Sequence, residues 1–376
     1  MKTSSALDAA TTALPPLYAG WIRELLGGAI PRETEATCDD CAMCSGEPGP
    51  GQGSEHFFDP HSKCCTYTPE LPNFLVGRVL LDEDPASAKG RATLLARLET
   101  GVGVTPLGLA RSSAQGVLYD HVARIGSFGW APALRCPHYL EEEGGLCGVW
   151  RHRNAVCATW FCKYARGTVG VTFWQSVLHL LLEVETELST WCAQELDPGP
   201  ESLQRLFPPP RAASLVERAQ RGDLDAPMDD EDRRVLWGRW ADRTREFYEE
   251  CARRVNGLTW AEVLSICGPT VRVLAGPARA AYAALLSNKV PPALRVGQFT
   301  VIGDAPSGSR VSSYSTLDPV DLPRPLLGAL HHFEGRSTQE ALDVIAKKEG
   351  IRIGRGLLRP LVDFGILVPA VPPKET

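Results

Sequence analysis

Nine of the twelve cysteines in this 376-residue chain lie in one window of the sequence. Three occur in CDDCAMC, two are adjacent, and four follow after an interval. Clustered thiols at short spacings, in a chain whose N-terminal segment does not resemble a secretion signal, indicate metal ligation rather than disulfides. We therefore expect these nine to be metal ligands: Cys38, Cys41, Cys44, Cys64, Cys65, Cys136, Cys147, Cys157 and Cys162.

The spacing of the first three cysteines suits a tetrahedral ion. Two thiolates on one ion sit about 4 Å apart, because metal–sulfur bonds are about 2.3 Å, and a two-residue turn lets them converge. The same C-x2-C-x2-C run begins a ferredoxin-type iron–sulfur pattern, whose fourth cysteine precedes a proline as Cys136 does. Nine thiols exceed the four that one closed site takes. We expect two metal centres, or an iron–sulfur cluster with a second metal; the cofactor is an iron–sulfur cluster or iron, with Zn²⁺ as the alternative.

Other residues near the cysteines could tune or complete such a site. Arg151 and Arg153 could lower the pKa of nearby thiols, or could instead form surface salt bridges. If the adjacent Cys64 and Cys65 lie on extended backbone, their side chains point to opposite faces and cannot serve the same ion. Four histidines lie beside the cysteines and could complete mixed sites: His56, His61, His138 and His152. Three later cysteines fall on apolar helix faces and are expected in the core: Cys192, Cys251 and Cys267.

The cysteine pattern over residues 38–166 resembles the YkgJ-like family of zinc- or iron-chelating CxxCxxCC domains. That family closes its motif with cysteine, an aromatic residue, arginine–proline and a final cysteine. Two departures stand out: an insertion separates the first three cysteines from the adjacent pair, and Asn154 replaces the proline. The resemblance implies metal binding and fixes neither the metal nor a reaction. The closing motif is matched by Cys147, Trp150, Arg153 and Cys157.

The elements that must position these thiols read as mainly helical. Apolar residues recur at helical spacing over about 170–191 and again over 229–255, and shorter helices are expected around 18–26 and before 290. The Gly- and Pro-rich stretch after Cys44 predicts a surface loop. We expect a mainly α (α+β) fold in four parts: a leader and short helix over 1–36, a metal-stabilised cysteine-rich domain over 37–167, a helical region over 168–290 and a winged-helix-like domain over 291–376.

The C-terminal part has the order of a winged helix, with strands, three helices and a final strand. Ser337 and Glu340 form a capping box that starts the second helix. The segment loosely resembles PqqD-like winged-helix modules, which implies a protein or peptide partner. DNA is a weaker alternative, because Pro360 interrupts the helix that carries the candidate phosphate contacts. Those contacts would be Arg352, Arg355 and Arg359.

Composition limits the functional classes. The formal net charge is −6, which disfavours a general polyanion binder, and no apolar stretch is long enough to predict a membrane span. We expect a cytoplasmic protein without membrane contact. The sequence favours a metal-binding protein accessory to a docked partner. Two alternatives stay open: an iron–sulfur redox or peptide-modification enzyme, and a metal- or redox-responsive transcription regulator.

Overall fold

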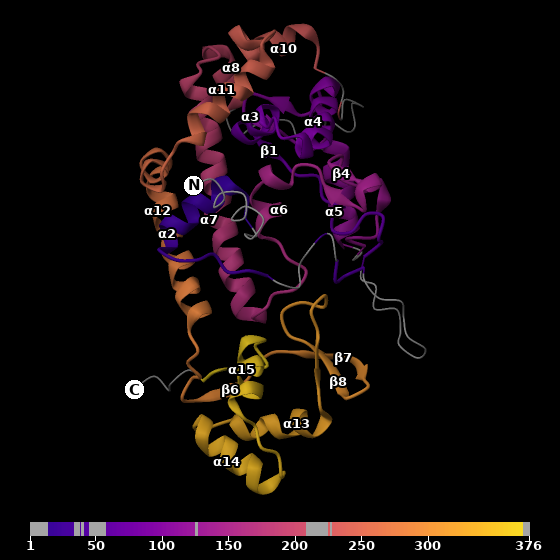
Figure 1. Cartoon of the computed structure of the whole chain (residues 1–376), viewed down its shortest axis with the longest axis vertical. Helices are drawn as coiled ribbons and strands as arrows, with labels where there is room; N and C mark the ends of the chain where they lie inside the picture. Colours follow the sequence, from indigo (N-terminus) through magenta and orange to yellow (C-terminus); the bar gives the residue numbers. More distant parts are fainter. Residues whose placement is uncertain are drawn as a thin grey trace. The chain divides into compact units, whose positions relative to one another are not determined.

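The computed structural model describes residues 14–33, 38, 41–44, 58–124, 127–207, 225 and 228–370. It is mainly helical with a few small sheets, which confirms the mainly α expectation (Figure 1). Of the leader and short helix expected over residues 1–36, residues 1–13 and 34–36 lie outside the described residues. Residues 45–57, most of the surface loop expected after Cys44, also lie outside them.

The chain divides into two compact units. Unit 1 comprises residues 1–32, 37–160 and 178–276, and unit 2 comprises residues 33–36, 161–177 and 277–376. Two long helices, α7 (Gly167–Glu195) and α12 (Trp260–Leu286), contribute residues to both. Eight of the nine clustered cysteines belong to unit 1.

Unit 1 is built around the packing of α3 on α11 (Figure 1). Gly77 permits this contact, because a Cβ atom there would clash with the main-chain carbonyl of Tyr248 on the facing helix. Trp237, Phe247 and Tyr248 stack edge to face and fill the core beside it. The helices of unit 1, apart from α7 and α12, are α2 (Pro16–Leu26), α3 (Asn73–Leu81), α4 (Ala88–Thr100), α5 (Ser113–Arg124), α6 (Ala155–Thr159), α8 (Pro200–Leu206), α10 (Asp230–Trp237) and α11 (Thr244–Asn256).

Two small sheets connect these helices. In the first, β3 (Gly108–Leu109) pairs with both β1 (Leu71–Pro72) and β2 (Val104–Thr105), all antiparallel. In the second, β4 (Tyr139–Leu140) pairs with β5 (Leu146–Cys147). Cys147, one of the candidate metal ligands, belongs to β5 of this second sheet.

The expected long helices are confirmed in part. The apolar face predicted over 170–191 is that of α7, with Phe173, Val177 and Leu181 fully buried. The single helix expected over 229–255 is wrong: the structure has α10, a 3-10 turn (Gly238–Trp240) and α11. Gly238 has a left-handed φ of 49° and lies against the carbonyl of Pro198, so the chain turns there although apolar residues continue at helical spacing.

Besides its parts of α7 and α12, the described part of unit 2 contains two further small sheets and the α-helices α13 (Arg324–Ala329), α14 (Thr338–Lys348) and α15 (Arg355–Asp363). Strands β7 (Thr300–Ala305), β8 (Gly308–Ser312) and β9 (Val320–Leu322) form an antiparallel sheet, and β6 (Leu294–Val296) pairs with β10 (Leu367–Pro369). The expected capping box of Ser337 and Glu340 is confirmed at α14.

None of the helices in the described ranges combines the length and the apolar character needed to cross a bilayer.

Candidate functional site

Main-chain hydrogen bonds bring the second and third groups of cysteines together in unit 1. The amide of Cys136 donates to the carbonyl of Cys65 at 2.7 Å. Cys147 then pairs across the β4–β5 ladder with Tyr139, and the amide of Gly148 donates to the carbonyl of His138 at 2.8 Å. Segments more than seventy residues apart in the sequence, around Cys65 and Cys136, therefore share one small framework.

Lys63 connects the first cysteine group to this framework. The side chain is buried, and its ammonium donates to the carbonyls of Cys38 at 2.7 Å, Gly144 at 2.9 Å and Gly145 at 3.1 Å. A buried ammonium group needs all three acceptors to replace its hydration. The residue before Cys64 thus holds the Cys38 segment beside the β4–β5 turn.

Cys64 and Cys65 lie in a turn rather than on extended backbone, so their thiols are not directed to opposite faces. The two side chains hydrogen-bond each other, and Cys41 and Cys44 do the same. In each of these two pairs the thiol groups thus lie within hydrogen-bonding reach of each other.

The eight thiols of unit 1 lie close enough to act on one another electrostatically. Burial, assisted by the neighbouring thiols Cys64 and Cys41, raises the pKa of Cys38 to about 12. Burial and then Cys147 raise the pKa of Cys136 and of Cys157. The pKa of Cys65 is also raised, because burial and the nearby Cys147 and Cys136 outweigh a hydrogen bond from Cys64 that lowers it. Distant groups of cysteines therefore share one environment that favours the neutral thiol.

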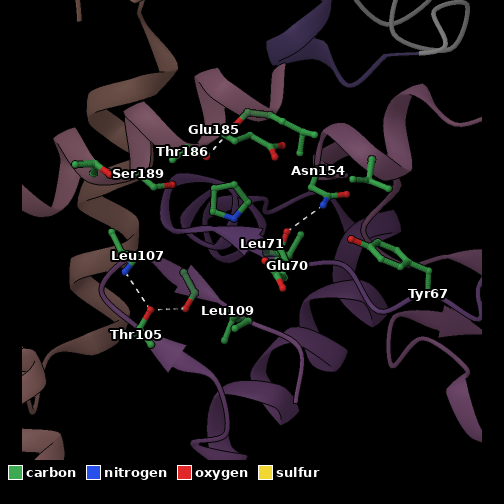
Figure 2. Close-up of a pocket in the computed structure, with 16 residues that line it drawn as sticks. Tyr67, Glu70, Leu71, Thr105, Leu107, Leu109, Asn154, Glu185, Thr186 and Ser189 are labelled. Atoms are coloured by element: carbon green, nitrogen blue, oxygen red, sulfur yellow. Dashed lines mark hydrogen bonds between the residues drawn. The ribbon is translucent and has the colours of Figure 1, made fainter. Parts of the chain in front are cut away.

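Asn154 positions the helix that carries Cys157. Its side-chain oxygen accepts from the amide of Cys157 at 3.1 Å, and its amide nitrogen donates to the carbonyl of Glu70 at 3.1 Å (Figure 2). At the same helix start, the carboxylate of Glu185 accepts from the amide of Ala155 at 2.6 Å. The residue that departs from the family's proline is therefore an N-cap, a role for which asparagine is among the preferred residues.

Arg153 faces the thiols. Its guanidinium stacks 3.4 Å from the ring centre of Trp150 and donates to the carbonyl of Cys157 at 3.2 Å. Burial raises the pKa of Cys147 to about 11, and the charge of Arg153 opposes this shift. The expected influence of Arg153 on Cys147 and Cys157 is confirmed in direction, but burial dominates.

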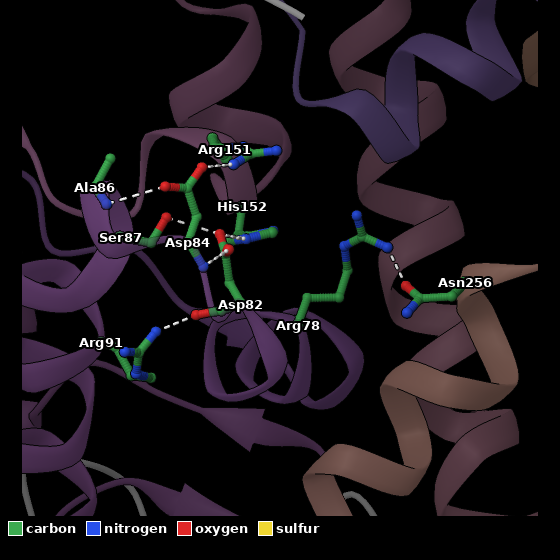
Figure 3. A network of polar contacts seen from close by, with 9 residues as sticks. All are labelled: Arg78, Asp82, Asp84, Ala86, Ser87, Arg91, Arg151, His152 and Asn256. Atoms are coloured by element: carbon green, nitrogen blue, oxygen red, sulfur yellow. Dashed lines mark hydrogen bonds and ion pairs between the residues drawn. The ribbon is translucent and has the colours of Figure 1, made fainter. Parts of the chain in front are cut away.

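Arg151 takes the alternative role. It forms a surface ion pair with Asp84 at 2.7 Å (Figure 3). In the same network His152 donates from Nε2 to Asp82 at 2.8 Å. Burial is the main cause of a lowered pKa at His152, so its ring is neutral at neutral pH. Asp82 keeps a lowered pKa: burial raises it, but hydrogen bonds from His152 and Ser87 outweigh burial.

His138 is engaged at both ring nitrogens. Arg97 can only donate, so Nε2 of His138, at 3.1 Å, is an acceptor, and Nδ1 carries the proton that is donated to Thr93 at 2.8 Å. Burial, with the charge of Arg97, lowers the pKa of His138 to about 3. Its main-chain amide approaches the sulfur of Cys136 at 3.4 Å. The histidine therefore supports the thiol beside it through its backbone.

The remaining candidates are one cysteine of unit 2, two histidines and three core cysteines. Cys162 belongs to unit 2, near Tyr164. His61 is exposed and lies 3.5 Å from Glu141, and His56 is outside the described residues. Cys192, Cys251 and Cys267 are buried in the core, as expected.

The gathered thiols do not form a complete metal-binding geometry in the described residues. Within the described ranges, no three His, Cys, Asp or Glu side chains are arranged so that they could hold a metal ion. The eight unit 1 cysteines are free thiols, so disulfides do not account for their proximity. The structure thus shows a gathering of thiols without a finished coordination sphere.

Sequence reasoning missed three supporting residues: Lys63, Asn154 and Glu185. Asn154 carried a usable signal, since an asparagine just before a short helical run is a common N-cap. Lys63 and Glu185 act on partners far away in the sequence, and no local pattern marks them.

Comparison of the chain with family models, with curated proteins and with solved structures finds no match. The resemblances to YkgJ-like domains and to PqqD-like modules therefore stay predictions from the sequence.

Proposed function

We propose that the protein binds metal through the eight thiols of unit 1, as one or two zinc, iron or iron–sulfur centres. One observation carries this proposal: cysteines from the segments 38–44, 64–65 and 136–157 converge on a shared framework although the chain between them forms helices and a sheet. Packing alone does not require a gathering of this kind, whereas thiolate ligation does.

The donor set suits a soft or borderline cation. Cys136 is buried and the other seven thiols are half-buried. The charges of Lys63 and Arg153 oppose but do not overcome the rise in the pKa of Cys38, Cys44 and Cys147. A bound cation stabilises thiolates directly and releases their protons. A cysteine sulfur is re-aimed by rotation about χ1 alone, so thiols already gathered can turn onto an ion without a new fold. Iron or an iron–sulfur cluster would supply electron transfer, and zinc would supply stability.

Metal and acid-labile sulfide analysis after anaerobic purification tests this proposal. Iron with sulfide supports a cluster, and zinc without sulfide supports a structural centre. Cys157→Ser is expected to lower the metal content and the free energy of unfolding, since ligand binding and folding are coupled. Cys267→Ser is the matched control, because it removes a buried thiol outside the cluster. A protein that binds neither metal under these conditions contradicts the proposal.

One of the three candidate phosphate contacts in unit 2, Arg359, is already paired, which weighs against DNA as the partner. On α15, Arg359 pairs with Asp363 at 2.8 Å, and Asp363 also binds Arg166 at 2.6 Å. A guanidinium neutralised in this way is a poor phosphate contact. An accessory role in a reducing compartment, where thiols remain available to metals, fits this arrangement. The regulator alternative predicts specific DNA binding that changes with metal occupancy, which a gel shift on apo and loaded protein tests.

An enzymatic role is the second candidate, and one observation favours it: a pocket in unit 1 is lined by Asn154 and Val156, on either side of the start of the helix that carries Cys157.

A further inference from the structure

A pocket of about 390 Å³ lies in unit 1 between α7, the β1–β3–β2 sheet and the start of α6 (Figure 2). This is the size range of sites for small molecules. Leu71 and Leu109 are buried in its wall, and the side chains of Thr186 and Ser189 come from α7 on the opposite side. The pocket therefore combines an apolar surface with a polar helix face.

The pocket wall is held in place by a buried amide. Asn73 donates from Nδ2 to the carbonyl of Pro106 and to the carbonyl of Ser189, each at 2.9 Å. One side chain thus fixes the distance between the β2–β3 turn and α7. A site fixed in this way is formed before a ligand arrives.

The described pocket lining carries acidic side chains and no basic ones. Glu70 and Glu185 contribute carboxylates, and the described lining contains no lysine or arginine. Glu70 lies at an exposed position and is 3.6 Å from Arg111, which offsets its charge. Glu185 is buried, so its carboxylate is the one that a bound ligand would meet away from water.

Only one of the two carboxylate oxygens of Glu185 accepts a hydrogen bond within the described residues. Tyr18 and the amide of Ala155 both donate to Oε1, and within the described residues these are the hydrogen bonds that the carboxylate accepts. Oε2 is left for a ligand. Oε2 is not among the fully buried atoms without a partner, so it keeps access to the pocket, where a donor or a cation can pair with it.

We propose that this pocket binds a small aliphatic primary amine, with its ammonium group paired to Oε2 of Glu185 and its alkyl stem on the accessible leucines of the lining, Leu107 and Leu182. The ligand supplies the positive charge that the lining lacks, and the leucines supply apolar area for the stem. This inference does not rest on metal binding.

Burial supports the assignment, because it raises the pKa of Glu185 to about 8 and marks a carboxyl group without a compensating cation. The ammonium group of a ligand would provide that cation. A ligand with a negative charge would meet the carboxyl group of Glu185 and would find no lysine or arginine in the described lining, so the site discriminates against it.

Titration calorimetry on the full chain tests the proposal with n-hexylamine as the probe, and with n-hexanol and hexanoate as matched ligands of neutral and negative charge. We expect n-hexylamine to bind at least tenfold more tightly than n-hexanol, and hexanoate not to bind. Glu185→Gln keeps the acceptor for Tyr18 and Ala155 and should weaken the amine at least tenfold while leaving n-hexanol unchanged. Glu183→Gln on the same helix, outside the pocket lining, is the control and should bind normally.

Thr186→Phe gives an independent check. Thr186 is exposed and lines the pocket, so a phenyl ring there should obstruct binding of the amine and of n-hexanol without altering Glu185. The proposal is overturned if the wild type does not bind n-hexylamine, if amine and alcohol bind equally, or if Thr186→Phe binds the amine as well as the wild type does. If Glu185→Gln fails to fold, the ligand series and Thr186→Phe decide alone.

Discussion

At the residue scale, Glu185 shows how one buried acid can join three parts of a unit. Its carboxylate accepts from Tyr18 on α2 and from the start of α6, while the residue itself is carried by α7. Neither donor is a cation, so burial prevails and the pKa of Glu185 rises to about 8. Burial thus favours the protonated form of Glu185, whereas the two hydrogen bonds favour the carboxylate and only partly offset burial.

Glu185 therefore predicts a pH dependence of stability. Because its folded pKa of about 8 exceeds its unfolded value of 4.5, the folded state binds the extra proton, and the free energy of unfolding should fall as pH rises from about 4.5 through 8. The loss is on the order of 3–5 kcal/mol. Glu185→Gln should remove this part of the slope in urea unfolding curves taken across the pH range. Glu183→Gln should retain the wild-type slope, and identical slopes in wild type and Glu185→Gln would contradict the prediction.

Lys63 should be among the most sensitive single positions near the thiols. Lys63→Met keeps most of the stem but leaves the carbonyls of Cys38, Gly144 and Gly145 without their shared donor. Hydrogen bonds to charged groups contribute about 1.5–3 kcal/mol each, so a loss of at least ~2 kcal/mol in the free energy of unfolding is expected. Urea unfolding with a chelator present measures it without metal. The exposed Lys289→Met is the control and should change stability by less than about 0.5 kcal/mol.

At the element scale, the α3–α11 contact depends on a glycine. Gly77→Ala would drive a methyl group into the carbonyl of Tyr248, so the helices must separate. Overpacking of this kind costs about 1–3 kcal/mol. Gly20→Ala on α2 is the matched control. A Cβ atom at Gly20 would have no atom of another described segment within 4 Å. Alanine there should stabilise the helix by up to about 1 kcal/mol. Thermal unfolding of the two variants should move in opposite directions, and a Gly77→Ala protein as stable as the wild type would contradict the close approach.

Elements were predictable where the signal was local. The apolar face of α7 follows from residues three or four positions apart, and the capping box at Ser337 and Glu340 follows from residues three positions apart. The structure confirms both. The break at Gly238 was not predictable, because Trp237 and Trp240 continue the helical spacing while the turn is imposed by backbone contact with Pro198. The candidate site divides in the same way: residue type marked the cysteines, whereas the buried charges that position them, such as Lys63, have partners distant in sequence.

At the scale of the whole molecule, thiols and partner-docking candidates belong to different units. The eight gathered cysteines are in unit 1, whereas α13, α14, α15 and their core are in unit 2. Unit 2 has its own buried core, including Phe333, Ile345 and Leu361. Stability that comes from a metal should therefore act on one unit before the other.

Chelation should loosen the two units unequally. If metal binds the gathered thiols, its removal should increase amide hydrogen exchange in the turn that carries Cys64 and Cys65 and in residues 136–157, because ligand binding stabilises the segments that hold the ligands. Exchange in α14, whose contacts are with the unit 2 core, should change little. Hydrogen exchange with mass spectrometry on loaded and chelator-treated protein measures both at once. Cys267→Ser should behave as the wild type does, while Cys157→Ser should resemble the chelated protein before any chelator is added. If chelation increased amide hydrogen exchange equally in both units, the metal would not act through the gathered cysteines and the prediction would be wrong.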